Sequence, residues 1–287
     1  MAVDGPEALE ESGIVVLAHG AARFHDQAAD LARSLRLHSP GQQVALLTDR
    51  PDEFRRGTLF DHVVLLPGAA SSDCRAKLDL NLYTPFRRTL YLDSDSLAFR
   101  DLGFVFHRHR GRDVVVLGRP IREGHWYGDV RSLCRLARAL SIPQFNGGVI
   151  YLEDTAVAHA VFRRARELVE HYDELSLDRF CGGVADEPLL ALALAERGID
   201  PDPRDADTSV SLLGLQGRPE LDVVSGRASF VKNGRAVSPA VVHFAGEYAE
   251  PASPEGVHYK KARAVLKEAI RNPRPGIPDR RPSSPVD

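Results

Sequence analysis

Short apolar runs alternate with amphipathic stretches along most of this chain, which leaves few folds open to it. Runs with the length of buried strands are "GIVVLAHG" (13–20), "QVALLTD" (43–49), "HVVLLPG" (62–68), "TLYLD" (89–93) and "DVVVLG" (113–118). A 3.6-residue apolar period predicts a helix from Phe24 to "SPG", and another is expected before Pro85. Strands that alternate with helices predict an α/β fold: a single Rossmann-like domain with a mainly parallel mixed sheet flanked by helices.

The second half of the chain continues the pattern. We expect helices over 129–141, 155–172, 186–198 and 258–272, and strands at "GGVIYLE" (147–153) and "AVVHFAG" (240–246). An Asn-Gly pair in "SFVKNGRAV" (229–237) predicts a hairpin. We therefore divide the chain into a loose arm (1–12), one domain (13–272) and a disordered tail rich in proline and arginine (273–287).

Bulk composition excludes several classes of function. The formal net charge of −3 over 287 residues gives no basic surface for nucleic acid, and no 18-residue apolar run predicts a transmembrane segment. The N-terminus lacks the basic-then-apolar order of a signal peptide. Three cysteines stand far apart without a CxxC pair, as expected for reduced thiols in a cytoplasmic protein. The dominance of arginine over lysine, with much alanine and proline, indicates a bacterial, GC-rich source.

The sequence "LYLDSDSL" places two carboxylates, Asp93 and Asp95, at the end of a predicted strand. Alternate side chains of an extended segment share a face, so Tyr91, Asp93 and Asp95 should point the same way and reach one divalent cation. Doubly wound sheets bind ligands beyond the carboxyl ends of their strands. We therefore favour a site that binds a metal and a diphosphate over a solvated turn, which stays open as the alternative.

Two other readings of this stretch fit less well. A haloacid-dehalogenase-like phosphatase has Thr or Val where Leu97 stands, and it needs a later acidic cluster. The chain has no adjacent pair of aspartates, and the required spacing after Asp129 fails at Leu133. A calcium-binding EF-hand loop needs a glycine where Ala98 stands.

Further candidates lie next to predicted strands and helices, and each also has a structural explanation. His243 ends a strand and is followed by a turn at Gly246; Asp186 is either an N-cap or a free carboxylate in the pocket. Lys77 precedes the strand with the aspartates, where it could equally lie on a solvated helix face. The glycines after Asn146 allow close approach of a ligand, although an ordinary turn would also use them.

Taken together and in order, five stretches resemble the retaining glycosyltransferases of the A-type (GT-A) fold, close to glycogenin and the lipopolysaccharide galactosyltransferases (family 8). The stretches are "RFHDQAADLARSL" (23–35), "KLDLNLYTPFRRTLYLDSDSL" (77–97), "FNGGVIYLED" (145–154), "DEPLLA" (186–191) and "HFAG" (243–246). The similarity covers about residues 13–250. The resemblance implies transfer of a sugar from a nucleotide-diphosphate donor, a UDP-sugar, to an acceptor hydroxyl with retention.

The resemblance also implies roles for individual residues. Asp93, Asp95 and His243 would bind Mn²⁺ or Mg²⁺, while Asn146 and Asp186 would orient the sugar and the acceptor as catalytic residues. The full set expected to bind the donor is Ala18, Phe24, Lys77, Asp93, Ser94, Asp95, Asn146, Gly147, Gly148, Asp186, Glu187 and Gly246.

Some positions depart from the family pattern. The family ending "HF.G..KPW" carries a lysine for the diphosphate, where this chain offers Glu247 and Glu250; Lys260, Lys261 or an arginine could replace it. The family's Asp-Gln pair has become Asp186–Glu187. These departures keep two alternatives open: a sugar nucleotidyltransferase, although the glycine-dense signature is lacking, and a nucleotide-binding protein that has lost turnover. The acceptor (a glycan, a lipid precursor or a small metabolite) and a homodimer also stay open.

Overall fold

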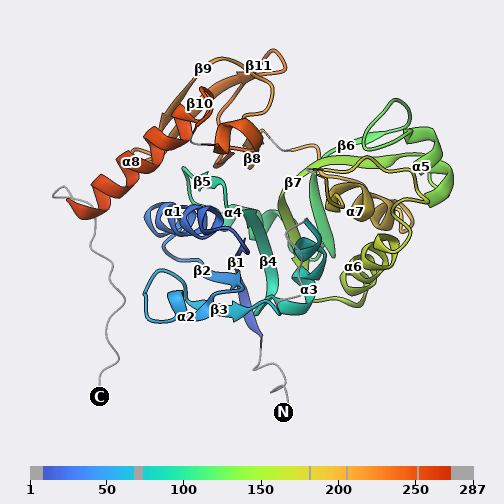
Figure 1. Cartoon of the computed structure of the whole chain (residues 1–287), viewed down its shortest axis with the longest axis horizontal. Coiled ribbons are helices and arrows are strands. Elements are labelled where there is room, and N and C mark those ends of the chain that lie inside the picture. Colours follow the sequence, from blue (N-terminus) through green and yellow to red (C-terminus); the bar gives the residue numbers. More distant parts are fainter. Residues whose placement is uncertain (1–8, 68–73, 181, 205, 251, 273–287) are drawn as a thin grey trace.

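A six-stranded mixed sheet forms the centre of the molecule (Figure 1). The structure is a computed structural model that describes residues 9–67, 74–180, 182–204, 206–250 and 252–272. The strand order is β3-β2-β1-β4-β7-β6, and the strands are β1 (Glu10–Ala18), β2 (Gln43–Thr48), β3 (His62–Leu65), β4 (Phe86–Asp93), β6 (Val114–Ile121) and β7 (Ile142–Glu153). The four strands from β3 to β4 are parallel, whereas β7 is antiparallel to both β4 and β6. The predicted α/β fold with a mainly parallel mixed sheet is confirmed.

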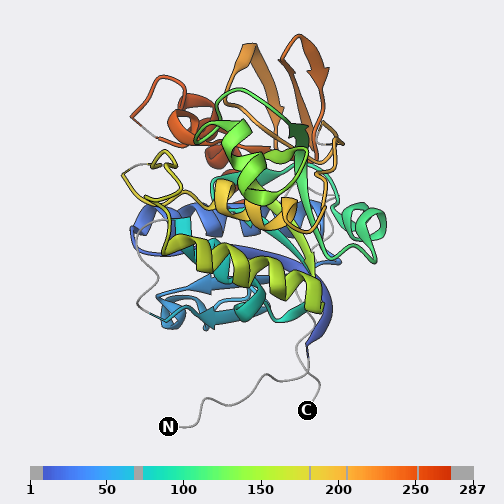
Figure 2. The same ribbon diagram turned by 90° about the vertical axis from the view of Figure 1, so that its right-hand side faces the viewer.

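Helices cover both faces of this sheet (Figures 1 and 2). Alternate residues of β1 point to opposite faces: Val15 packs with α5–α7, while Ile14 and Val16 pack with α1 and α4. The helices are α1 (Ala22–His38), α2 (Pro51–Phe54), η1 (Cys74–Asp79), α3 (Leu80–Tyr83), α4 (Gly103–His109), α5 (Val130–Ala137), α6 (Ala156–Val169), α7 (Asp186–Ala195), η2 (Gly246–Ala249) and α8 (Val257–Arg271). No helix among the described residues is long and apolar enough to span a bilayer.

Two small sheets lie above the carboxyl ends of the parallel strands (Figure 1). One has the order β5-β12-β8, with β5 (Ser96–Ala98), β8 (Ser209–Ser211) and β12 (Val241–His243). The other is built from β9 (Leu215–Asp222), β10 (Arg227–Lys232) and β11 (Arg235–Val237). The predicted hairpin is β10–β11, and its turn residues Asn233 and Gly234 both have positive φ, as a tight hairpin turn requires.

The central sheet begins within the predicted N-terminal arm. Strand β1 begins at Glu10, so the last residues of the expected 1–12 arm belong to the sheet, where Glu10 pairs with Phe86. Residues 1–8 and the expected tail, 273–287, lie outside the described residues.

Candidate active site

Asp93 and Asp95 do not lie on one extended strand, because a turn begins directly after Asp93. Asp93 is the last residue of β4, whereas Asp95 lies in the two-residue turn that leads into β5. The backbone carbonyl of Asp95 accepts the N–H of Phe244 (2.9 Å), and His243 pairs with Ser96 across the β5–β12 ladder. The two carboxylates do converge, as predicted. The predicted cause, alternation along one strand, is wrong, because Asp95 lies in the turn. The turn and its pairing with β12 bring them together.

His243 completes a compact group of potential metal ligands. Its Nε2 lies 3.0 Å from Asp95 Oδ1 and 3.6 Å from Asp93 Oδ2, and one ligand atom from each residue lies within 4.8 Å of the other two. Burial lowers the pKa of His243, but the charges of Asp95 and Asp93 outweigh this and raise it. Two carboxylates and an imidazole are ligands that a divalent cation such as Mn²⁺ accepts, so the residues fit a metal site.

Asn146 fixes the orientation of the His243 ring. The amide oxygen of Asn146 lies 2.8 Å from His243 Nδ1 and also accepts the backbone N–H of Gly148 (3.1 Å). Because an amide oxygen only accepts, Nδ1 carries the proton and Nε2 faces the two carboxylates. A hydrogen bond on the second ring nitrogen is typical of histidines that bind metals. Asn146, expected to orient the sugar, thus contacts the candidate metal ligand directly.

Lys77 links the aspartates of the site. Its Nζ lies 2.9 Å from Asp93 Oδ1, 3.7 Å from Asp186 Oδ2 and 3.5 Å from the Gly147 carbonyl. The hydroxyl of the fully buried Tyr91 donates to Asp93. Asp93 therefore has two partners that hold its carboxylate in place. The sequence singled out Tyr91 only as a neighbour on the same face, and its hydrogen bond was not predicted.

Asp186 and Glu187 bring two further carboxylates over the backbone of Gly147. The N-cap of α7 is Ala185 and Asp186 is the first residue of the helix, so the interpretation of Asp186 as N-cap is wrong. Glu187 Oε1 accepts the N–H of Gly147 (2.6 Å). Burial and the charge of Asp186 raise the pKa of Glu187 to about 7, against the hydrogen bonds from Gly147 and Tyr127.

The remaining predicted donor-binding residues surround the ends of β1 and β12. Ala18 ends β1, and buried Ser94 follows β4. Phe24 lies in the first turn of α1, with the guanidinium of Arg23 4.8 Å from its ring centre. Gly246 begins η2 with a φ of +61°.

An ion pair that the sequence did not predict joins α1 to the end of η2 beside these residues. Arg23, next to Phe24, contacts Glu250, one of the two acids that stand near the family's lysine. Both side chains are about half exposed. No local pattern identifies such a pair, because its members are 227 residues apart.

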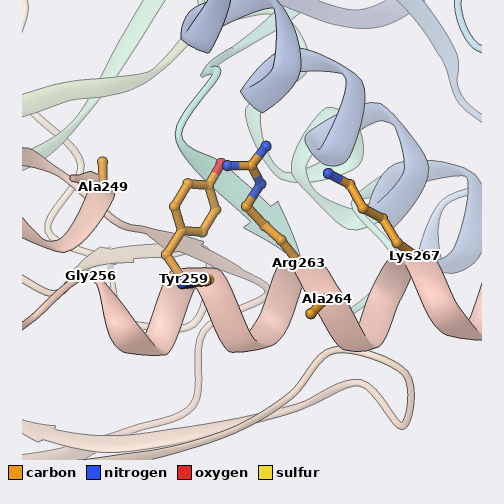
Figure 3. Close-up of a pocket in the computed structure, with 7 residues that line it drawn as sticks. Ala249, Gly256, Tyr259, Arg263, Ala264 and Lys267 are labelled. Atoms are coloured by element: carbon orange, nitrogen blue, oxygen red, sulfur yellow. The ribbon is translucent and has the colours of Figure 1, made fainter. Parts of the chain in front are cut away.

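The cations proposed to replace the family's lysine lie on α8. Lys260 and Arg263 line a cavity of about 280 Å³, together with Ala249 and Lys267 (Figure 3). In Figure 3 the side chains of Tyr259, Arg263 and Lys267 all extend from α8 toward α1. Lys261 instead faces a separate hollow beside β9. Lys260 and Lys261 thus line different hollows beside α8.

Comparison with protein-family models and with curated protein sequences finds no match. Solved structures do match. The galactosyltransferase LgtC, in complex with donor and acceptor sugar analogs, has a TM-score of 0.59 at 15% identity, over 89% of this chain and 95% of LgtC. The glycosyltransferase GlyE of Streptococcus pneumoniae TIGR4 has a TM-score of 0.54 at 14% identity, over 91% of this chain and 63% of GlyE. The bifunctional glycosyltransferase WbbM has a TM-score of 0.53 at 11% identity, over 88% and 52%. The chain thus shares the GT-A-type fold of these glycosyltransferases, as its sequence motifs predicted.

Proposed function

We propose that the protein is a metal-dependent glycosyltransferase that moves a sugar from a nucleotide-diphosphate donor, a UDP-sugar, to an acceptor hydroxyl with retention. The observation that carries the proposal is the group of Asp93, Asp95 and His243 at the carboxyl edge of the parallel strands. This edge is where doubly wound sheets bind nucleotides. The fold shared with glycosyltransferases supports the same chemistry.

A divalent cation, Mn²⁺ or Mg²⁺, bound by Asp93, Asp95 and His243 would offset the negative charge that develops on the departing diphosphate. The protein's own part is to hold these ligands in place. Lys77 and Tyr91 bind Asp93, and Asn146 binds the far side of the His243 ring. The ligands are therefore positioned before any donor arrives, which lowers the cost of assembling the site.

The sugar and the acceptor hydroxyl would bind beside Gly147, where Asp186 and Glu187 converge. We assign Asp186 and Asn146 the role of orienting the reacting groups, and Lys77 the role of balancing the acidic charge between Asp93 and Asp186. Phe24, in the first turn of α1, would contact the base of the donor nucleotide.

Turnover tests this proposal. UDP release is measured with a panel of UDP-sugars in Mn²⁺, in Mg²⁺ and in EDTA, for the wild type and for Asp95→Asn, with the exposed Asp52→Asn as the matched control. Release of UDP that requires the metal and is lost in Asp95→Asn supports the proposal; the Asp52→Asn variant should match the wild type. Release that persists in EDTA contradicts it. NMR of the product anomer then tests retention.

The charges near η2 favour one second candidate, a nucleotide-binding protein without turnover. Residues 247–256 contain no lysine or arginine, and Glu250 in this segment contacts Arg23 of α1. If UDP binds with Mn²⁺ and no UDP-sugar is consumed, the second candidate replaces the first.

A further inference from the structure

One exposed surface combines arginines with leucines and is not used by the proposed mechanism. It is formed by the end of β6, α5 and the turn into β7, and we call it the α5 surface. Figure 1 shows α5 at the opposite side of the molecule from α8. Its members are exposed side chains between residues 119 and 140: Arg119, Arg122, Arg131, Arg135, Leu136, Arg138 and Leu140.

The charge of this segment is opposite in sign to that of the whole chain. It contains five arginines and two acids, Glu123 and Asp129, whereas the chain has a formal net charge of −3. Asp129 is occupied as the N-cap of α5, and Glu123 pairs with Arg131. Arg122 and Arg138 form no ion pair with any residue that the structure describes. The surface is therefore net cationic.

Two leucines lie among these arginines. Leu140 is 87% exposed, more than any other large apolar side chain among the described residues, and Leu136 is 44% exposed. Helix α5 buries its other face through Val130 and Leu133, so the leucines are not needed for the core. Arg138 adopts the left-handed conformation that ends the helix, and Leu140 follows it in the connection to β7. Single exposed leucines need no explanation, but exposed leucines next to arginines combine the apolar and basic side chains that interfacial membrane segments use.

The α5 surface is directly connected to the candidate active site. Strand β7 begins two residues after Leu140 and carries Asn146 and Gly147. The six residues from Leu140 to Asn146 span about 20 Å in extended conformation. Tyr127, which precedes α5, hydrogen-bonds to Glu187. A partner bound at Leu140 would therefore lie within about 20 Å of Asn146.

We propose that the α5 surface binds an anionic lipid bilayer, with Leu136 and Leu140 inserted among the headgroups and the arginines on lipid phosphates. Apolar side chains and basic side chains contribute together to such binding, which neither achieves alone. Resting on the proposed function, this assigns the acceptor to the class of membrane-anchored molecules, whose hydroxyl extends about 20 Å from the bilayer.

Sedimentation with vesicles tests the proposal on the full-length protein. Vesicles are made of phosphatidylcholine alone or with about 30 mol% phosphatidylglycerol. We expect the protein to sediment with the anionic vesicles only, and less of it at high salt. The affinity for anionic vesicles should fall about tenfold or more in Leu136→Ser/Leu140→Ser and in Arg135→Gln/Arg138→Gln. The control is Leu65→Ser/Leu82→Ser, which alters two other exposed leucines, on β3 and α3.

Several results would overturn the proposal: no sedimentation with anionic vesicles, equal binding to neutral vesicles, or equal loss in the control variant. A concentration-dependent dimer in analytical ultracentrifugation that the leucine variant abolishes would assign the surface to a second copy of this chain instead. Membrane binding and sugar transfer can be tested independently of each other. Asp95→Asn should still bind vesicles, and the leucine variant should still bind UDP with Mn²⁺.

Discussion

At the scale of single residues, the site depends on hydrogen bonds that hold the candidate metal ligands. Asn146 is the clearest case, because its amide oxygen is the partner of His243 Nδ1. We predict that Asn146→Ala lowers the affinity for Mn²⁺ about 10- to 100-fold, the usual loss when such a partner is removed. Calorimetric titration with Mn²⁺ measures it. Gln144→Ala, which removes from the same strand a partly exposed amide that contacts Arg119, should leave the affinity unchanged.

Gly148 is required because the His243 ring occupies the space of a side chain. A Cβ at Gly148 would overlap Nδ1 and Cε1 of that ring. We predict that Gly148→Ala displaces His243, costs about 1–3 kcal/mol of unfolding free energy and weakens Mn²⁺ binding. Urea denaturation and Mn²⁺ titration measure the two effects. In contrast, Gly41→Ala meets no atom within 4 Å and should change neither.

At the scale of secondary-structure elements, a buried carboxylate attaches α8 to α1. Asp30 of α1 is fully buried and contacts Arg33 of its own helix together with Arg263 and Lys267 of α8. Removing one partner of a buried ionic group leaves the others uncompensated, which is strongly destabilising.

We therefore predict that Asp30→Asn lowers the unfolding free energy by about 2–4 kcal/mol. This loss is smaller than the loss expected for breaking a fully buried ion pair, because Lys267 is partly exposed. Equilibrium urea unfolding measures the loss. Asp52→Asn is the matched control, because its ion pair with Arg55 is exposed and is worth at most about 1 kcal/mol. Equal losses in the two variants would show that the contact with α8 does not stabilise the fold.

The long elements of this fold could be predicted from the sequence, whereas the short ones could not. Strands β1 and β4 are apolar runs, and α6 shows a clear 3.6-residue period. Strands β5 and β8 have only three residues each, too few for any periodic pattern, and their pairing with β12 is long-range.

The same limit applies to the site. The resemblance of five motifs to a known family was enough to predict which side chains meet, including Lys77, Asp93, Asp95 and His243. The geometry of the site could not be predicted from the sequence, because it depends on tertiary contacts. The turn at Asp95 is fixed by β12, and the carboxylate of Asp186 lies near Lys77 instead of capping α7.

At the scale of the whole molecule, a buried histidine makes the fold sensitive to acid. His109 is 1% exposed, and burial lowers its pKa to about 4, partly opposed by the charge of Asp202. Between about pH 6.5 and pH 4 the unfolded chain binds a proton at this position and the folded chain does not. Stability from neutral His109 is therefore complete above about pH 6.5 and falls as the pH drops toward 4.

We predict that this single group costs about 2–3 kcal/mol of unfolding free energy by pH 4. Urea unfolding of the wild type and of His109→Leu, over this range, measures it: the variant should lose less stability than the wild type as the pH falls. The exposed His107→Gln should follow the wild type. Parallel curves for the wild type and His109→Leu would assign the acid sensitivity to other groups.

The assembly of β4, β12 and the turn between β4 and β5 brings together Asp93, Asp95 and His243, which we propose bind a metal that in turn binds a diphosphate. Calorimetry of UDP binding with Mn²⁺ and then with EDTA, for the wild type and Asp95→Asn, tests it most directly. We predict binding of UDP only with Mn²⁺ and only by the wild type. Binding that is the same in EDTA and in the variant would contradict the claim, and the fold would then be shared with the glycosyltransferases without their metal site.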